Sequence, residues 1–254
     1  LSANASDPAQ SVYYALYKAL LDKQVVTSGA TSGPGPYFRL KIGGVYLPVQ
    51  LIGICQDTKT AGGKAGLTFQ MRDIYAYNNT RSTAAGGGAF NYTYMNSTNA
   101  NSGGWSSSAM RSTLRSTFWN YLTAEVRSAI VPVNKYQQLS SGTSASNLQK
   151  TTNETIWLPS MYEVFGTTFS GFNEAEALTS VSGYAPFQYM AYRGNAGATT
   201  HTKAVKAYNG SANNWWLRSV RRDSTGFCAV SPAGIRSGGN GASYPNGALP
   251  AFCL

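Results

Sequence analysis

Charged side chains are scarce in this chain. They make up 12% of its 254 residues, about half of the share that is usual in soluble proteins. Ser, Thr, Asn and Gly take their place, which favours a solvent-exposed fold rich in strands and loops. The net charge of +10 is compatible with an anionic cell envelope as a partner, but the basic residues are scattered and form no run. The charge pattern therefore argues against a nucleic-acid-binding protein.

Metal-binding side chains are also few. The only histidine is His201, and the three cysteines, Cys55, Cys228 and Cys253, form no CxxC pair. A zinc site needs several such ligands close together, so we expect no metal and no other cofactor. We expect all three cysteines to be buried free thiols, with Cys228 and Cys253 as neighbours on adjacent strands as the alternative.

Two further absences limit the function. No apolar run approaches the length of a membrane-spanning helix. Acid–base catalysis needs positioned carboxylates or histidines, but the chain has only ten carboxylates, and His201 has no recognisable Asp or Ser partner motif. We therefore expect a protein that is not an enzyme.

The first thirty residues predict a helix. Asp7 and Pro8 form a typical helix start, and Val12, Leu16 and Leu20 recur every four residues. Such a helix either serves attachment or assembly, for example in a homo-oligomer such as a trimer, or packs on its own domain. We expect a helical segment over residues 1–30 and one larger domain over residues 31–254.

Residues 37–202 show strand, helix and loop patterns in turn. Strands are predicted over residues 37–42 and 45–57 around a Gly43-Gly44 turn, and Pro48 predicts that the second strand is interrupted or lies at an edge. The remaining predictions are, in chain order, a β-rich stretch over 66–77, a short strand over 90–95, a helix from residues 106–108 that buries Met110, Leu114 and Phe118, a helix from Thr123 to Ile130, a loop over 135–153, an apolar strand and turn over 155–165, and irregular structure over 166–202.

The last forty residues differ from the rest in composition. Lys, Glu, Gln, Met and Trp occur 33 times in residues 1–216 and never in residues 217–254. None of these five types can be reached from an Asn codon by replacing only its two adenines, whereas the types that fill the tail can be. A Gly- and Ser-rich loop that lacks long side chains by chance is the alternative explanation.

The tail also contains a recognisable frame. In order, it reads Trp215-Trp216-Leu217-Arg218-Ser219, Phe227-Cys228-x-Val230, Gly234, Asn246-Gly247 and Pro250-Ala251-Phe252. This frame resembles the variable region of proteins diversified by diversity-generating retroelements, in which adenine-directed mutagenesis rewrites Asn codons. Such regions lie at the C-terminus of C-type-lectin-like domains in phage receptor-binding proteins and bacterial surface proteins.

Motifs outside the tail extend the resemblance over roughly residues 37–254. They are Gly103-Gly104-Trp105-x-x-Ser108-x-x-Arg111, Ile130-x-Pro132-Val133, Ile156-Trp157-Leu158-Pro159-Ser160-x-x-Glu163 and Trp216-Leu217-Arg218-Ser219. Their order is similar to that in a bacterial and phage family of lectin-like domains of unassigned function.

The resemblance implies an α+β protein with a C-type-lectin-like fold, in the variant found in formylglycine-generating enzymes. This fold has two helices, small antiparallel sheets and long ordered loops, and the variable region would cover about residues 213–254. We expect Arg218 to be bound to backbone carbonyls or to a carboxylate. The side chains expected to be buried are Trp215, Trp216, Leu217, Phe227, Val230 and Phe252.

The resemblance also implies a non-enzymatic receptor- or ligand-binding protein. It would be a phage tail protein at the virion tail tip, or an extracellular adhesin at a cell surface. Its partner would be a protein or glycan on a host or neighbouring cell. The mixture of Tyr, Arg and small polar residues in the tail is typical of a binding surface. The expected contacts are Arg221, Arg222, Asp223, Ser224, Thr225, Ala229, Ser231, Ala233, Ile235, Ser237, Asn240, Ser243 and Tyr244.

Two alternatives stay open, namely a virion structural or decoration protein without a variable ligand and an enzyme. The Leu158–Glu163 segment is similar to one in formylglycine-generating enzymes, but those need a pair of copper-binding cysteines. We expect Pro159 and Glu163 to set a turn and a buried hydrogen bond instead. Calcium-dependent sugar binding is disfavoured because the Glu-Pro-Asn and Gln-Pro-Asp loops of such lectins are missing and Asp223 is the only carboxylate in the tail.

Overall fold

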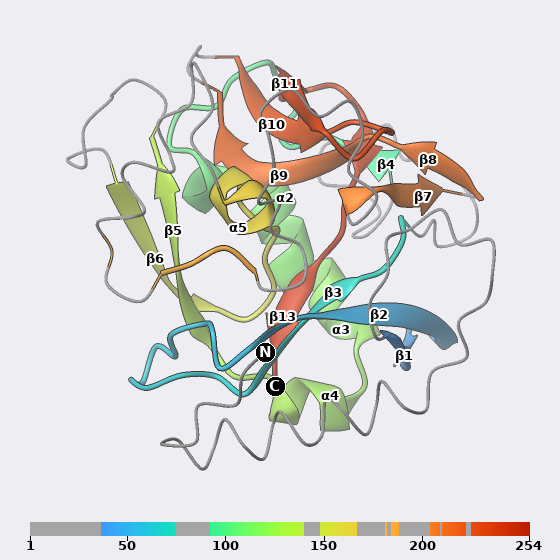
Figure 1. The fold of residues 1–254 in the computed structure, drawn as a ribbon, viewed down its shortest axis with the longest axis vertical. Coiled ribbons are helices and arrows are strands. Elements are labelled where there is room, and N and C mark those ends of the chain that lie inside the picture. The colour runs from blue at the N-terminus through green and yellow to red at the C-terminus, as the bar shows by residue number, and fades with distance from the viewer. Residues whose placement is uncertain are drawn as a thin grey trace.

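The computed structural model of this chain describes residues 37–74, 92–139, 148–166, 181, 184–187, 204–208, 210–221 and 225–254. Within them, short helices and several small sheets confirm the α+β class. Figure 1 shows β9, β10 and β11 at the top of the molecule, the sheet with β1 and β2 in its lower half, and the hairpin of β5 and β6 along one side. The predicted N-terminal helix and most of the segment predicted to be irregular lie outside the described residues.

A four-stranded antiparallel sheet brings the start and the end of the described chain together. Its order is β1-β2-β3-β13, with bounds Tyr37–Ile42, Val45–Ile54, Leu67–Met71 and Ala251–Cys253. The predicted hairpin is confirmed, since Gly43 and Gly44 have φ values of 58° and 87°, which glycine adopts easily. None of the described helices is long and apolar enough to cross a membrane.

The prediction for Pro48 is wrong. Strand β2 runs through Pro48 without a break and lies between β1 and β3. The carbonyl of Pro48 accepts a hydrogen bond from the amide of Arg72, one residue after β3 ends. Pro48 therefore lies opposite the residue that follows β3, so its missing N–H affects the ladder only at the end of that strand.

A five-stranded sheet contains most of the tail. Its order is β11-β10-β9-β12-β4, and only the β12–β9 pair is parallel. The bounds are Arg236–Gly241, Gly226–Val230, Trp215–Val220, Asn246–Gly247 and Tyr92–Thr93. A small hairpin of β7 (Lys206–Tyr208) and β8 (Ser211–Asn213) precedes β9.

The predicted helices are confirmed where apolar spacing and caps agree. Met110, Leu114 and Phe118 are all fully buried, and Ser108 and Thr123 cap the two helices. The elements are a 3₁₀ turn η2 (Trp105–Ser107), α2 (Ala109–Thr113), a π-helical turn η3 (Leu114–Phe118), α3 (Trp119–Tyr121) and α4 (Ala124–Ala129).

The loop predicted over residues 135–153 is wrong for its described part. Strands β5 (Val133–Gln138) and β6 (Leu148–Glu154) form an antiparallel hairpin there. Apart from Val133 at its start, its buried side chains are polar: Lys135, Gln137 and Glu154 are 0–1% exposed. The alternation of apolar residues that reveals a strand in a sequence is therefore missing.

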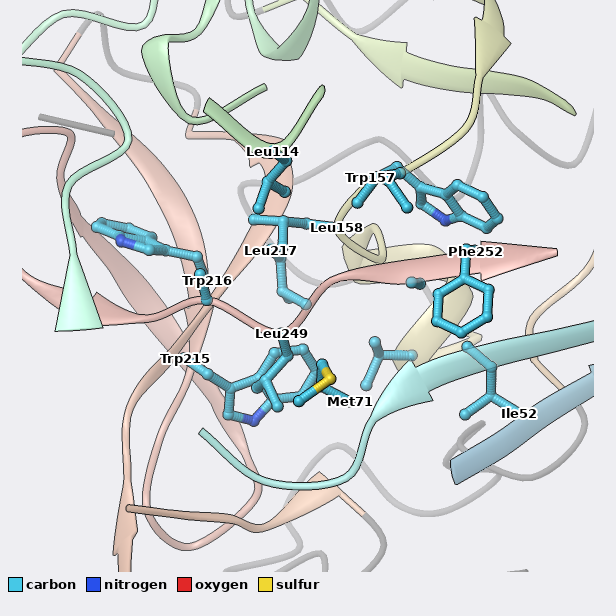
Figure 2. Packing of buried hydrophobic residues seen from close by; sticks show 14 of the residues in the cluster. Ile52, Met71, Leu114, Trp157, Leu158, Trp215, Trp216, Leu217, Leu249 and Phe252 are labelled. Atoms are coloured by element: carbon cyan, nitrogen blue, oxygen red, sulfur yellow. The ribbon is translucent and has the colours of Figure 1, made fainter. Parts of the chain in front are cut away.

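The core lies between the two larger sheets and the helices. Figure 2 shows Trp215, Trp216 and Leu217 of β9 packed among side chains from other segments, such as Leu249 and Met71. The six tail residues expected to be buried are all 0–1% exposed. The indole N–H of Trp216 donates to the Thr93 carbonyl at 2.8 Å, so the ring is fixed in orientation as well as buried.

Candidate binding surface

Arg218, the charged residue of strand β9, bonds this strand to neighbouring segments. Its guanidinium donates to the carbonyl of Leu158 at 2.8 Å, to that of Tyr136 at 3.0 Å, and to the Glu163 carboxylate. Arg218 is fully buried. The prediction that backbone carbonyls or a carboxylate bind Arg218 is confirmed.

Glu163 is the partner at the centre of this contact. It lies in helix α5 (Met161–Phe165), and Ser160 and Glu163 form a capping box in which Oε2 accepts from the Ser160 amide at 2.8 Å. The expected buried hydrogen bond is thus confirmed, but the predicted turn is wrong, because the capping box begins a helix at this point. Burial opposes the ionisation of Glu163, but the positive charges of Arg218 and Lys135 outweigh it and hold the pKa of this carboxyl well below its usual range.

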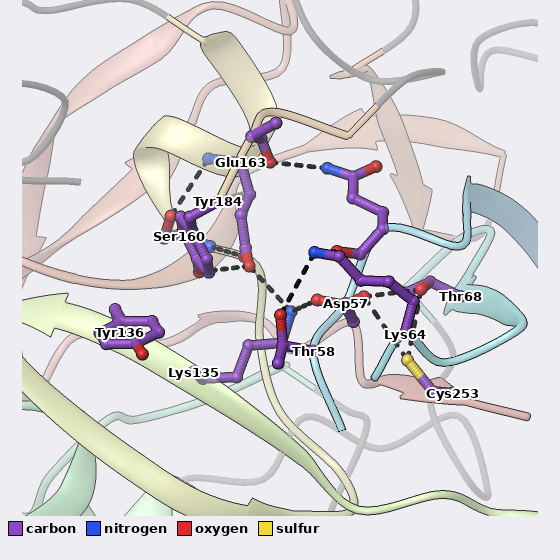
Figure 3. Close-up of polar contacts among 12 residues, drawn as sticks. Asp57, Thr58, Lys64, Thr68, Lys135, Tyr136, Ser160, Glu163, Tyr184 and Cys253 are labelled. Atoms are coloured by element: carbon purple, nitrogen blue, oxygen red, sulfur yellow. Dashed lines mark hydrogen bonds and ion pairs between the residues drawn. The ribbon is translucent and has the colours of Figure 1, made fainter. Parts of the chain in front are cut away.

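Further groups extend the contact into a network, which we call the buried charge network: the buried Asp57, Lys135, Glu163 and Arg218, with the half-buried Tyr184. Figure 3 draws Asp57, Lys135, Glu163 and Tyr184 of this network. The Lys135 ammonium bonds Glu163 at 2.8 Å and also Asp57, while the Tyr184 hydroxyl donates to Glu163 at 2.6 Å. Burial raises the pKa of Tyr184 well above its usual value, so it stays a donor. Every charge is thereby matched inside the protein, and the network joins β5, α5 and β9 to the loop after β2.

A second buried carboxylate explains the motif around Trp105. Glu154 at the end of β6 accepts from the Trp105 indole at 3.3 Å and from Nε of Arg111 at 2.8 Å. Glu154 is fully buried, and Trp105 and Arg111 come from the first helical segment. These residues hold η2 and α2 against the β5–β6 hairpin.

Strand β11 and the loops before and after β10 and β11 form the surface on which most of the predicted contacts lie. Tyr244 is 58% exposed and Thr225 is exposed. The half-buried predicted contacts are Arg221, Ser231, Ala233, Ile235, Ser237, Asn240 and Ser243, and Arg236 is half-buried beside them. We call this set, with Tyr244 and Thr225, the tail face. Arg222, Asp223 and Ser224 lie outside the described residues.

The backbone of the tail face is closely defined. In the turn between β10 and β11, the Gly234 amide donates to the Ser231 carbonyl at 2.9 Å and the Ser231 amide to the Ile235 carbonyl at 2.7 Å. Gly234 has a φ of 74°, which explains a glycine at this point of the frame. Side chains around this turn can therefore change while the backbone bonds persist.

Residues 66–254 match the family model of a domain of unknown function, DUF6273. This match covers more than half of the chain. The chain belongs to the DUF6273 family. No curated protein and no solved structure matches it. In this DUF6273 chain the match begins just before β3 and ends at the last residue, so it includes Glu163, Arg218 and the whole tail face, and leaves out β1, β2 and Asp57.

One predicted contact of the DUF6273 domain needs correction. Ala229 is 0% exposed, because all five residues of β10 are buried and both faces of this strand are therefore covered. It pairs with Trp216 on one neighbour and with Ser237 on the other. Ala229 is a core residue, and its side chain does not reach the tail face.

The cysteines of the DUF6273 domain are free, as expected. Cys228 lies in β10 of the five-stranded sheet and Cys253 in β13 of the four-stranded sheet, so they are not strand neighbours. Cys55 is half-buried rather than buried. Across the described ranges, no three His, Cys, Asp or Glu side chains are grouped as metal ligands, and His201 lies outside those ranges.

One contact of the tail face could not be predicted from the sequence. Loop residues 96–101, which we call the asparagine loop, contact it through side chains that no motif singled out. Asn101 donates to the carbonyls of Arg221 and Gly226 at 3.2 and 2.7 Å, and Asn99 accepts from Ser243. Three asparagines within six residues are the only trace in the sequence, and they are as typical of an ordinary loop.

Proposed function

We propose that this DUF6273 domain is a ligand-binding protein with a C-type-lectin-like fold, and that the tail face is its binding surface. The specificity of that surface would be changed by adenine-directed mutagenesis of the tail codons. The partner would be a protein or glycan on the surface of another cell, met at a phage tail tip or at a bacterial surface. Assembly through residues 1–30 stays a prediction.

One observation carries the proposal: within the tail, buried side chains fill the core, and the exposed or half-buried side chains lie on a backbone that is bonded through its own amides and carbonyls. Trp215, Trp216, Leu217 and Arg218 fill the interior. Tyr244 and Thr225 are exposed at the ends of strands whose ladders and turns are bonded through the backbone. A surface of this kind can change its side chains without losing its shape.

The composition of the tail face supports a binding role. Tyr244 is a large rigid ring that loses little entropy on binding, and Arg236 offers a planar donor group. Small polar residues around them provide hydrogen bonds that can adapt to different partners. A backbone that is already ordered lowers the entropic cost of association.

A display library tests the proposal directly. Thr225, Ile235, Arg236, Ser237 and Tyr244 would be randomised together on cell-displayed protein, and clones would be selected for binding to purified lysozyme as a model target. A matched library would randomise Trp216, Phe227, Ala229, Val230 and Phe252 of the same tail. We expect specific lysozyme binders from the first library, with melting temperatures close to that of the parent, and no folded clones from the second.

Two results would contradict the proposal. One is loss of folding across the first library, because the tail face would then be part of the core. The other is a first library that folds well but gives no binder after repeated selection.

A further inference from the structure

We infer that the asparagine loop, residues 96–101, positions the tail face: Asn101 holds its first loop and Asn99 holds the turn that presents Tyr244. The inference rests on the proposed function, because it assigns positioning residues to the binding surface. These residues lie more than a hundred positions before the tail, outside the region where the missing residue types point to diversification.

Asn101 holds the loop between β9 and β10. Its side chain is 1% exposed, and Nδ2 donates to the carbonyls of Arg221 and Gly226, the residues on either side of that loop, at 3.2 and 2.7 Å. The Arg221 amide also donates to the Gly226 carbonyl at 2.9 Å. One buried amide thus closes the base of the loop by bonding these two backbone carbonyls. Substitutions of side chains within the loop leave these bonds intact.

Asn99 does the same for the turn between β11 and β12. Its Oδ1 accepts from the amide of Ser243 at 3.1 Å and from the Ser243 hydroxyl at 2.6 Å. A methyl group added at Gly241 would overlap this Oδ1 and contact the Tyr244 ring. The Asn99 amide and the Tyr244 ring therefore lie together over Gly241. Asn99 is itself exposed, so it holds the turn that carries Tyr244 and also borders this ring on the surface.

Backbone hydrogen bonds also join the two loops to each other and to the start of the asparagine loop. The amides of Met95 and Asn96 both donate to the Ala242 carbonyl, at 2.9 and 3.0 Å, and the Ala242 amide donates to the Thr225 carbonyl at 2.9 Å. The Asn96 side chain accepts from the Ala109 amide at 3.0 Å, where α2 begins. The two loops are therefore held against a helix that does not belong to the tail.

The consequence is a division of roles. The tail supplies changeable side chains, and the asparagine loop supplies a fixed reference that does not change with them. Preorganisation of this kind improves affinity by lowering the ordering cost of binding, whatever the contacts are.

The test uses Asn99, since it is exposed and its loss should not prevent folding. N99A removes both bonds to Ser243, whereas N99D keeps an oxygen that accepts both. S97A in the same exposed loop is the matched control. Amide hydrogen exchange without ligand would be measured at Ser243, and affinity would be measured with a lysozyme binder from the library above.

We expect N99A to lower the protection of the Ser243 amide about tenfold and to weaken lysozyme binding by a similar factor, with N99D and S97A within about twofold of the parent binder. Unchanged Ser243 protection in N99A overturns the inference. So does a loss of protection that leaves the affinity unchanged, because Asn99 would then be structural only. A library that yields no binder defeats the proposed function instead, and the exchange data tell the two failures apart.

Discussion

Arg218 of the buried charge network and Tyr244 of the tail face belong to the same C-terminal region, but their surroundings are held in opposite ways. Around Arg218, the bonds depend on particular side chains: Glu163 must be a carboxylate and Lys135 an ammonium for the buried charges to match. Around Tyr244, the bonds run to backbone amides and carbonyls, and the side chains that secure them belong to the asparagine loop. In the first region, the buried partners determine which residue type is accepted at each position. In the second region, the main requirement is that the side chain can lie at the surface.

The largest expected effect comes from breaking the network. E163Q removes the negative charge between Arg218 and Lys135 and leaves two buried cations undercompensated, so the free energy of unfolding should fall by about 3–5 kcal/mol. Urea unfolding at pH 7 measures this loss. E125Q at the start of α4 is the control, because Glu125 is exposed, and it should change stability far less.

The pH dependence of this effect has a defined sign. The pKa of Glu163 is lowered in the folded state, so its stabilising contribution is present above its ordinary value of 4.5 and is lost as the pH falls below that value. The difference between wild type and E163Q should therefore shrink in acid. An E163Q protein as stable as wild type at pH 7 would show that the network does not secure β9.

A smaller effect is expected at Lys206. This lysine is buried without an ion-pair partner among the described residues, unlike the charges of the buried charge network. Among the described residues Lys206 forms no ion pair, and its ammonium donates to Oε1 of Gln50 at 3.1 Å. Burial lowers its pKa from the ordinary 10.5 to about 8. Between these values the unfolded chain binds more protons than the folded one, so stability should rise as the pH is raised from 8 to 10.5.

K206M removes this dependence. The stability of wild type relative to K206M should rise by about 3 kcal/mol across that window, and the tyrosines that titrate there are shared by both proteins and cancel in the difference. K41M, at an exposed lysine of β1, is the control. Parallel pH curves for wild type and K206M would contradict the assignment of a buried, destabilising ammonium.

The sequence predicts the fold correctly where turn residues, helix caps and regularly spaced apolar side chains mark an element. The hairpin at Gly43, the caps at Ser108 and Thr123 and the buried aromatic residues of β9 follow from turn chemistry, capping and burial. The β5–β6 hairpin did not, because Lys135 and its neighbours bury polar groups whose partners are distant in the chain.

Only part of the candidate site could be predicted from the sequence, because burial and bonds between distant residues are not visible there. Exposure of Tyr244 follows from its position among small polar residues, but Ala229 was misassigned because nothing in the sequence says that β10 is covered on both sides. Asn99 and Asn101 could not be assigned at all, since they bond mainly backbone atoms of the tail, and backbone atoms leave no signature in a sequence.

The most direct test of the central claim is deep sequencing of the 3′ end of this gene across a natural population of its source. We predict that substitutions cluster between codons 220 and 246, fall where a template has adenine, and concentrate at exposed positions such as Tyr244. They should spare Trp216, Arg218 and Phe252, and also Asn99 and Asn101 upstream. A tail as invariant as the rest of the gene, or substitutions spread evenly over buried and exposed codons, would contradict a diversified binding surface.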